Sequence, residues 1–190
     1  MKNIAIFASG SGSNAEAIIQ YFANKSDAGV SLIISNKPTA YVLERAKFHD
    51  IPSIVINRES FYNDREIINV LNEYDIDLLV LAGFLWLVPE YLIDIYPDKI
   101  MNIHPALLPK YGGKGMYGKN VHKAVKENRE EMSGITIHYV NKQYDEGKHL
   151  FQASVRLSEN DSADDIAAKV LKLEHKYYPR VIDYILTGLN

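Results

Sequence analysis

Short apolar segments alternate with longer amphipathic ones along the first hundred residues, and this alternation constrains the fold more than any other feature. Five segments are short, rich in Ile, Val and Leu, and bounded by turn residues: Ile4–Ala8, Val30–Ile34, Ile54–Ile56, Leu78–Ala82 and Ile100–His104. Continuous apolar runs of this kind are typical of strands buried on both faces of a parallel sheet. Helical patterns lie between them, at Ala15–Ala23, Tyr41–His49, Arg65–Tyr74 and Glu90–Ile95. The sequence therefore predicts an α/β fold with a doubly wound, mostly parallel sheet.

After residue 105 the pattern changes. Four elements are expected there in order: a glycine-rich loop at Leu108–Asn120, a short helix at Val121–Glu127, and two strands at Gly134–Val140 and Leu150–Leu157. The polar turn Asn141–His149 joins the two strands, which predicts a hairpin added to the sheet. A long helix follows from about Ala163 to Leu186, with Asp161 or Ser162 as its N-cap. There is no internal repeat and no linker, so we expect a single domain over residues 1–190.

Charge and composition exclude several classes of protein. The chain has 21 Lys and Arg residues against 24 Asp and Glu, so no basic field would attract nucleic acid or a membrane surface. It has no Cys, which excludes disulfides, thiolate zinc sites and iron–sulfur clusters. The longest apolar run, Leu78–Val88, is shorter than the about 20 residues of a membrane span, and the N-terminal apolar segment is too short for a signal peptide. We expect a cytoplasmic protein with no nucleic-acid or membrane partner.

The segment Ser9–Asn14 (Ser-Gly-Ser-Gly-Ser-Asn) lies between the first strand and the first helix. The start of a helix presents free N–H groups and the positive end of its dipole, and glycines let the backbone approach a phosphate closely. The segment lacks the third glycine of a dinucleotide fingerprint and the Gly-Lys-Ser/Thr of a P-loop. The residues alone leave two interpretations equally open: an anion site, or a plain turn capped by Ser13 or Asn14.

Asn102 and His104 end the fifth predicted strand, and they share one face because side chains alternate along a strand. An amide and an imidazole together can stabilise an oxyanion and move a proton. Taken alone, a core histidine beside a turn-forming Asn is the more common arrangement. A carboxylate from Asp145 would raise the pKa of His104 and fix its tautomer, and catalysis would then use the imidazolium. The sequence alone does not place the hairpin turn that carries Asp145.

Two further features bear on ligands. Gly83 ends the fourth predicted strand, and Phe84 and Trp86 follow it, where they could flank a flat aromatic ligand. A core strand that leads into a helix is the alternative for this segment. Four histidines (His122, His138, His149 and His175) show no metal-ligand spacing, so no metal site is predicted.

Several of these segments resemble one family. The matching sequences, in order, are Ile4–Asn14 with its G-S-G-S-N, Ile34-Ser35-Asn36-Lys37, Leu81-Ala82-Gly83-Phe84, Asn102-Ile103-His104-Pro105-Ala106-Leu107-Leu108-Pro109 and Glu174-His175-Lys176-Tyr177-Tyr178-Pro179. They resemble the folate-dependent phosphoribosylglycinamide formyltransferases over nearly the whole chain. The resemblance implies a Rossmann-like formyltransferase fold, with a phosphate-binding half of about residues 1–100 and a folate-binding and catalytic half of about 101–190.

The resemblance also implies roles for individual residues. The substrate-binding residues are Gly12, Ser13 and Asn14, which match a phosphate-binding segment, and Glu174, which matches a ribonucleotide contact. The folate-binding residues are Arg65 and Leu85, Trp86, Leu87 and Val88, and the catalytic residues are Asn102, His104 and Asp145. The co-substrate would be 10-formyltetrahydrofolate, with no metal, and the protein would be a monomer or homodimer whose partners are small molecules. Two positions depart from the family, Leu171 and Trp86, and the loop Tyr111–Asn120 is longer than usual.

The implied reaction is formyl transfer to the amine of 5′-phosphoribosylglycinamide in purine biosynthesis, through a tetrahedral intermediate stabilised by Asn102 and His104. Two other reactions remain open, hydrolysis of formyltetrahydrofolate and formylation of a sugar-nucleotide amine. A folate- or nucleotide-binding module without catalysis is the non-enzymatic alternative. The loop Tyr111–Asn120 is expected to act as a lid, with Lys114 or Lys119 near the folate tail.

Overall fold

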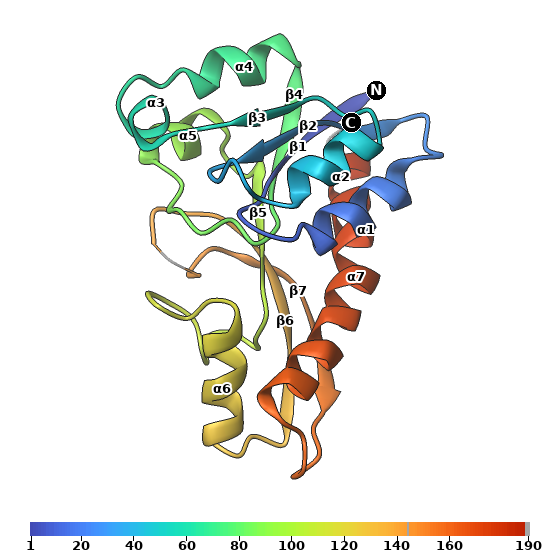
Figure 1. The fold of residues 1–190 in the computed structure, drawn as a ribbon, viewed down its shortest axis with the longest axis vertical. Helices are drawn as coiled ribbons and strands as arrows, with labels where there is room; N and C mark the ends of the chain where they lie inside the picture. Colours follow the sequence, from blue (N-terminus) through green and yellow to red (C-terminus); the bar gives the residue numbers. More distant parts are fainter. Residues whose placement is uncertain (144, 189–190) are drawn as a thin grey trace.

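The computed structural model describes residues 1–143 and 145–188, and its strands form a seven-stranded sheet in the order β3-β2-β1-β4-β5-β6-β7 (Figure 1). The strands are β1 (Lys2–Phe7), β2 (Ala28–Ser35), β3 (Ser53–Val55), β4 (Ile76–Leu81), β5 (Ile100–His104), β6 (Met132–Tyr139) and β7 (His149–Arg156). The helices are α1 (Ser13–Phe22), α2 (Val42–Phe48), α3 (Arg58–Tyr62), α4 (Ile67–Glu73), α5 (Glu90–Ile95), α6 (Lys119–Glu127) and α7 (Ala163–Gly188). The predicted mostly parallel sheet, the hairpin and the long final helix are confirmed. Helix α3 was not predicted.

Strand β1 lies inside the sheet and is buried on both faces. Ile4 and Ile6 pack into a core that α1, α2 and α7 cover. Ala5 and Phe7, which point the other way, pack into a second core under α3, α4 and α5. Because helices cover both faces of the sheet, the residues from Ile4 to Phe7 are apolar whichever face they point to. This explains the continuous apolar runs in the sequence.

The direction of winding reverses at β1. Strands β2 and β4 both pair with β1 in parallel, one on each side, so the loops that follow β1 and β4 open at the same edge of the sheet. Ser9 joins these two loops: its N–H donates to the Gly83 carbonyl (3.1 Å), and its hydroxyl accepts from the Leu85 N–H (2.9 Å). Gly83 has a φ of 76°, a conformation that glycine adopts without steric cost. This edge is where ligands bind in sheets of this kind.

The last part of the chain extends the sheet on the far side of β4. Strand β6 runs antiparallel to β5, and β7 antiparallel to β6. Helix α7 crosses from the β6–β7 end to the β1 end (Figure 1). Its Tyr178 is fully buried, with the hydroxyl 3.0 Å from the Leu81 carbonyl and 3.1 Å from the Met101 carbonyl, so it ties α7 to β4 and β5. None of the helices in the described residues combines the length and apolar character needed to span a membrane.

Candidate active site

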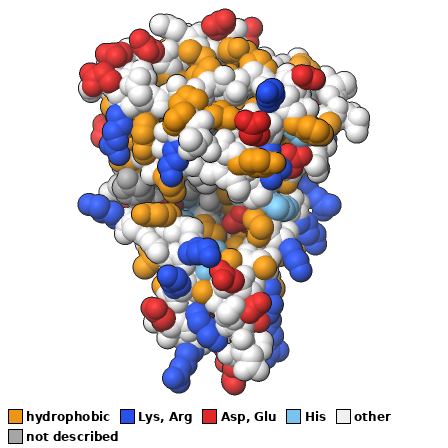
Figure 2. Space-filling model, viewed as in Figure 1, with side chains coloured by type: hydrophobic (Ala, Val, Ile, Leu, Met, Phe, Trp, Pro, Cys, Tyr) orange, Lys and Arg blue, Asp and Glu red, His pale blue; other side chains and the backbone are white. Residues whose placement is uncertain are grey.

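A cleft of about 750 Å³ opens at the carboxyl ends of β1, β4 and β5. Its lining includes Ser9–Asn14, Gly83–Val88, Asn102–Pro105, Gly113–Lys119, His122, His138, Asp145, Leu171 and Glu174. In the space-filling view the surface is hollowed where the broad upper part of the molecule meets the narrower lower part (Figure 2). Segments far apart in the sequence thus meet in one cleft, including the three strand ends at which ligands were expected.

One end of the cleft is formed by the start of α1. The N-cap of this helix is Gly12, with φ 69° and ψ 29°, and no side chain caps the helix, so neither Ser13 nor Asn14 is the cap that a plain turn would have had. Within residues 1–143 and 145–188, no acceptor is bonded to the backbone N–H groups of Ser11, Gly12, Ser13 or Asn14. Free N–H groups at a helix start, with the positive end of the dipole, favour an anion.

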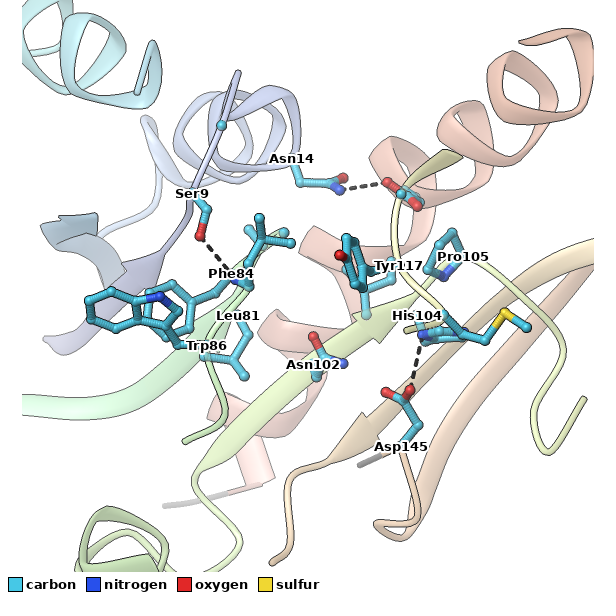
Figure 3. Close-up of a pocket in the computed structure, with 18 of the residues that line it drawn as sticks. Ser9, Asn14, Leu81, Phe84, Trp86, Asn102, His104, Pro105, Tyr117 and Asp145 are labelled. Carbon is cyan, nitrogen blue, oxygen red and sulfur yellow. Dashed lines mark hydrogen bonds and ion pairs between the residues drawn. The ribbon is translucent and has the colours of Figure 1, made fainter. Parts of the chain in front are cut away.

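Two side chains beside this helix start retain unused hydrogen-bonding capacity. Asn14 Nδ2 donates to Glu174 Oε2 at 2.6 Å (Figure 3), and the buried Asn14 Oδ1 has no partner in the part of the chain that the structure describes. Burial raises the pKa of the Glu174 carboxyl, and the hydrogen bond from Asn14 opposes that shift. The pair can accept hydrogen bonds from hydroxyl or amine groups of a ligand.

The other end of the cleft lies at the end of β5. Asp145 Oδ2 is 3.5 Å from His104 Nδ1 and accepts a hydrogen bond of 2.9 Å from the Gly113 N–H (Figure 3). Asn102 lies on the same strand as His104 and also lines the cleft. The structure therefore places Asp145, which the sequence alone could not place, beside His104.

The pKa of His104 shifts downward, so the expectation of a raised pKa was wrong. Burial of the imidazole is the main cause, and it outweighs the opposing effects of Asp145 and the Tyr111 carbonyl. His104 Nε2 donates to that carbonyl at 2.7 Å, which puts the proton of the neutral ring on Nε2. For Asp145, burial acts to raise the pKa, but the nearby rings of His138 and His104 and the hydrogen bond from the Gly113 N–H lower it. The resting site thus pairs a neutral imidazole with a carboxylate.

Two histidines that the sequence analysis did not assign to the site also line the cleft. His138 is directly opposite Asn102 across the β5–β6 pair, and its Nε2 accepts from Asn102 Nδ2 at 3.2 Å. The other ring nitrogen of His138 donates to the Tyr139 carbonyl at 2.8 Å, which fixes its tautomer. His122 on α6 is buried, and its Nδ1 has no partner within the described residues. The register of β5 on β6 is the signal that identifies His138, but the sequence does not show it.

The segment Leu85–Val88 forms an apolar wall of the cleft. Trp86 belongs to an aromatic cluster, with ring centroids 6.1 Å from Phe84 and 5.9 Å from Phe61. The Arg58 guanidinium lies over the Trp86 ring at 5.1 Å. Arg65 is not among the residues that line the cleft; its guanidinium lies 5.0 Å from the centre of the Tyr91 ring.

The remaining expectations concern the loop and metals. Lys114 and Lys119 line the cleft, and Lys119 also forms an exposed ion pair of 3.2 Å with Asp164 at the start of α7. Leu171 of α7 lines the cleft and is 37% exposed. Among residues 1–143 and 145–188, no group of three or more His, Asp or Glu side chains is arranged to hold a metal ion.

Comparison with known proteins gives the family. The family model named Formyl transferase matches residues 2–182 of the chain. The chain belongs to the formyl transferase family. Within it, the chain is 39% identical to phosphoribosylglycinamide formyltransferase of Bacillus subtilis, over 100% of this chain and 97% of that protein. It is 42% identical to the chloroplastic enzyme of the same name from Arabidopsis thaliana, over 97% of this chain, and spans only 65% of that protein.

Solved structures of this family agree. The fold matches a crystal structure of phosphoribosylglycinamide formyltransferase from Bacillus halodurans with a TM-score of 0.89 and 36% identity, over 100% of this chain and 97% of the other. It matches glycinamide ribonucleotide transformylase 1 from Symbiobacterium toebii with a TM-score of 0.90 and 31% identity, over 99% and 89% of the two chains. The formyltransferase fold that the resemblance implied is therefore confirmed.

Proposed function

We propose that this formyl transferase moves a formyl group from 10-formyltetrahydrofolate to the amine of 5′-phosphoribosylglycinamide, a step of de novo purine biosynthesis. One observation supports the proposal: a single cleft has a helix start with unbonded N–H groups at one end, among the described residues, and an Asn–His–Asp group at the other. A substrate with both a phosphate and a reactive amine can span the two ends. The names of the relatives support the same reaction.

In this proposal each end of the cleft binds one part of the substrates. The N–H groups at Gly12, Ser13 and Asn14 bind the phosphate, and Glu174 accepts hydrogen bonds from the rest of the ribonucleotide. The apolar wall Leu85–Val88 suits a flat pterin, because Trp86 supplies an aromatic surface and Leu85 is 46% exposed. Arg65 does not line the cleft, and we propose that it interacts with the folate at longer range.

The chemistry follows from the protonation states of the resting site. The amine attacks the formyl carbon, a C–N bond forms, and the carbonyl oxygen gains negative charge. Asn102 uses one amide hydrogen for His138 and has a second for this oxyanion, and such a donor is worth ~3–4 kcal/mol. Neutral His104 accepts the proton of the attacking amine through water at Nδ1, the ring nitrogen that carries no proton, and Asp145, 3.5 Å from Nδ1, stabilises the imidazolium. The proton then passes to the folate nitrogen as its bond to the formyl carbon breaks.

The other candidate functions use only part of this cleft. A formyltetrahydrofolate hydrolase attacks with water and needs no phosphate site, whereas a binding module needs no Asn102, His104 and Asp145 together. A sugar-nucleotide formyltransferase would use both ends but a different amine. The division into a phosphate-binding half and a catalytic half stays part of the proposal, although Glu174, from the second half, bonds to Asn14 in the first. We also propose that the protein acts in the cytoplasm as a monomer or homodimer.

The test is a folate absorbance assay with 10-formyltetrahydrofolate, with and without phosphoribosylglycinamide. Transfer predicts turnover only when the amine is present, with formylated ribonucleotide as product. Turnover without the amine would identify a hydrolase, and binding without turnover a binding module. The Asn102→Ala variant tests whether the turnover comes from this site. It should lower kcat by about 100- to 1,000-fold, with the protein still folded by circular dichroism.

A further inference from the structure

Helix α2 lies behind the loop Ser9–Asn14 and holds two of its carbonyl groups. The Val42 N–H donates to the Gly10 carbonyl at 3.1 Å, and Arg45 Nε donates to the Ser11 carbonyl at 2.8 Å. Neither Val42 nor Arg45 lines the cleft, whereas the whole loop does. The loop therefore has α2 on one side and the cleft on the other.

These two carbonyl contacts also fix the direction of neighbouring N–H groups of the loop. In a trans peptide the carbonyl of one residue and the N–H of the next point in opposite directions. Because the carbonyls of Gly10 and Ser11 point to α2, the N–H groups of Ser11 and Gly12 point away from it. These are two of the N–H groups that have no acceptor among the described residues. The contacts with α2 thus set the direction of donors that an anion in the cleft would meet.

Arg45 is itself held in place. Its Nη1 is 2.8 Å from Glu16 Oε2, while His49 Nε2 donates to Glu16 Oε1 at 2.8 Å. Burial acts to raise the pKa of Glu16, but hydrogen bonds from His49, Arg45 and Gln20 lower it, so the carboxylate is charged. The Tyr41 ring lies 5.1 Å from the guanidinium carbon. With the guanidinium fixed by Glu16, Nε is directed at the Ser11 carbonyl.

The same cluster also offsets a charge near the anion site. Glu16 is in the first turn of α1, and an unpaired carboxylate there would repel a bound phosphate. Arg45 and His49 both bond to it. The loop Ser9–Asn14 also packs closely against α2, because a Cβ added at Gly12 would lie 2.6 Å from Val42 Cγ2.

We propose that Arg45 is a positioning residue for phosphate recognition: it orients the loop Ser9–Asn14 from behind, through the Ser11 carbonyl, without touching the substrate. This inference rests on the proposed function for the identity of the anion. In this proposal the planar shape of the guanidinium, and not its positive charge alone, sets the direction of the N–H groups of the loop. A lysine cannot reproduce both hydrogen bonds, because its single ammonium lacks the fixed fork that bonds Ser11 and Glu16 together.

The experiment compares Arg45→Gln and Arg45→Lys with Lys47→Gln, which removes a charge from an exposed position of the same helix. Each protein is assayed with phosphoribosylglycinamide and with the riboside that lacks the phosphate. Both Arg45 variants should raise the KM for the ribonucleotide by about tenfold, the effect of losing one hydrogen bond to a charged group. The folate KM, kcat, and kcat/KM for the riboside should stay within twofold of wild type. Lys47→Gln should match wild type throughout.

Three results would overturn the inference. Full rescue by Arg45→Lys would mean that charge alone suffices. An equal loss with the riboside would mean general damage to the fold, which a fall in the melting temperature measured by circular dichroism would reveal. An unchanged KM for the ribonucleotide in both Arg45 variants would mean that Arg45 does not contribute to ribonucleotide binding. The proposed function fails in a different way, because the wild-type protein itself would then show no transfer to phosphoribosylglycinamide.

Discussion

The two ends of the cleft are built on different principles. The helix-start end uses backbone N–H groups from one continuous segment, Ser9–Asn14, supported from behind by α2. The other end, which we call the catalytic end, uses side chains from separate segments: Asn102 and His104 on β5, His138 on β6, and Asp145 in the hairpin turn. Backbone donors keep their identity whatever the side chains are, whereas each side chain of the catalytic end depends on its neighbours for its orientation and charge.

This difference predicts how each end responds to substitution. Changes at the helix-start end should alter ground-state binding and therefore the KM for the ribonucleotide. Changes at the catalytic end should alter the stabilisation of the transition state and therefore kcat. A variant that violated this division would show that the two ends are coupled, and the Asp145 and Gly12 variants below test it.

The largest effect is expected for Asp145→Asn at the catalytic end. The pKa of His104 lies below its ordinary 6.5, so His104 is neutral at pH 7 and kcat should fall as the pH falls through that lowered value. Asp145 is a charge that raises this pKa, so its removal should move the acid limb of the kcat profile to still lower pH. The plateau should drop by about 100-fold or more, because the imidazolium formed in the reaction loses its counter-ion.

The matched control for Asp145→Asn is Glu146→Gln, which neutralises the next, exposed carboxylate in the same turn. Its pH profile should overlay that of the wild type. Measurement of kcat from pH 5 to 9 with both substrates saturating separates the two variants. An acid limb of Asp145→Asn that stays in place, or a change in KM alone, would make Asp145 a binding residue.

The same contrast explains what the sequence could predict. The strands were predictable because burial on both faces leaves continuous apolar runs, and the segment Ser9–Asn14 because all its residues are adjacent in the chain. The position of Asp145 depends on the packing of a hairpin turn, and the pairing of His138 with Asn102 depends on the register of β5 on β6. The pKa of His104 depends on how deeply the fold buries it. Helix α3 is five residues long, too short for a helical period to stand out.

At the helix-start end, Gly12→Val should raise the KM for the ribonucleotide by about tenfold or more and leave the folate KM unchanged. Gly12 has a φ of 69°, and any Cβ there would meet Val42 at 2.6 Å, so a valine would displace the loop from α2. Gly29→Ala in β2 is the control, since Gly29 does not line the cleft and an added Cβ there meets only the end of the Met1 side chain, at 3.9 Å. Steady-state kinetics with each substrate varied in turn gives both constants. Equal damage to the two KM values would contradict the assignment of this loop to the phosphate.

Glu174→Gln should stabilise the protein while it weakens ribonucleotide binding. Burial raises the folded pKa of Glu174 above its unfolded value of about 4.3, so the wild-type protein loses stability as the pH rises from the unfolded toward the folded pKa. The variant avoids this loss, so its melting temperature should exceed that of the wild type at pH 7. The gain should vanish below about pH 4, where both proteins are neutral at this position.

The control for this comparison is Glu44→Gln, which changes an exposed carboxylate on α2 and should leave the melting temperature unchanged. Thermal unfolding followed by circular dichroism at pH 4 and pH 7 gives all the values. A lower melting temperature for Glu174→Gln at pH 7 would mean that the charged carboxylate stabilises the ligand-free fold. The buried carboxylate at the helix-start end would then not reduce the stability of the protein.

The smallest effect concerns the apolar wall Leu85–Val88 of the cleft. Trp86 is the one tryptophan of the chain, it lines the cleft, and it lies beside Phe84 and the Arg58 guanidinium. If the segment Leu85–Val88 contacts the pterin, a bound folate analogue should displace water from the indole and change its emission by about a few tens of per cent, whereas ribonucleotide bound at the helix start should leave it unchanged. Fluorescence titrations with each ligand alone, with Trp86→Phe as the blank for tyrosine emission, measure this difference. A silent Trp86 with folate shown by calorimetry to be bound would place the pterin elsewhere, and an equal response to both ligands would show that the two ends move together.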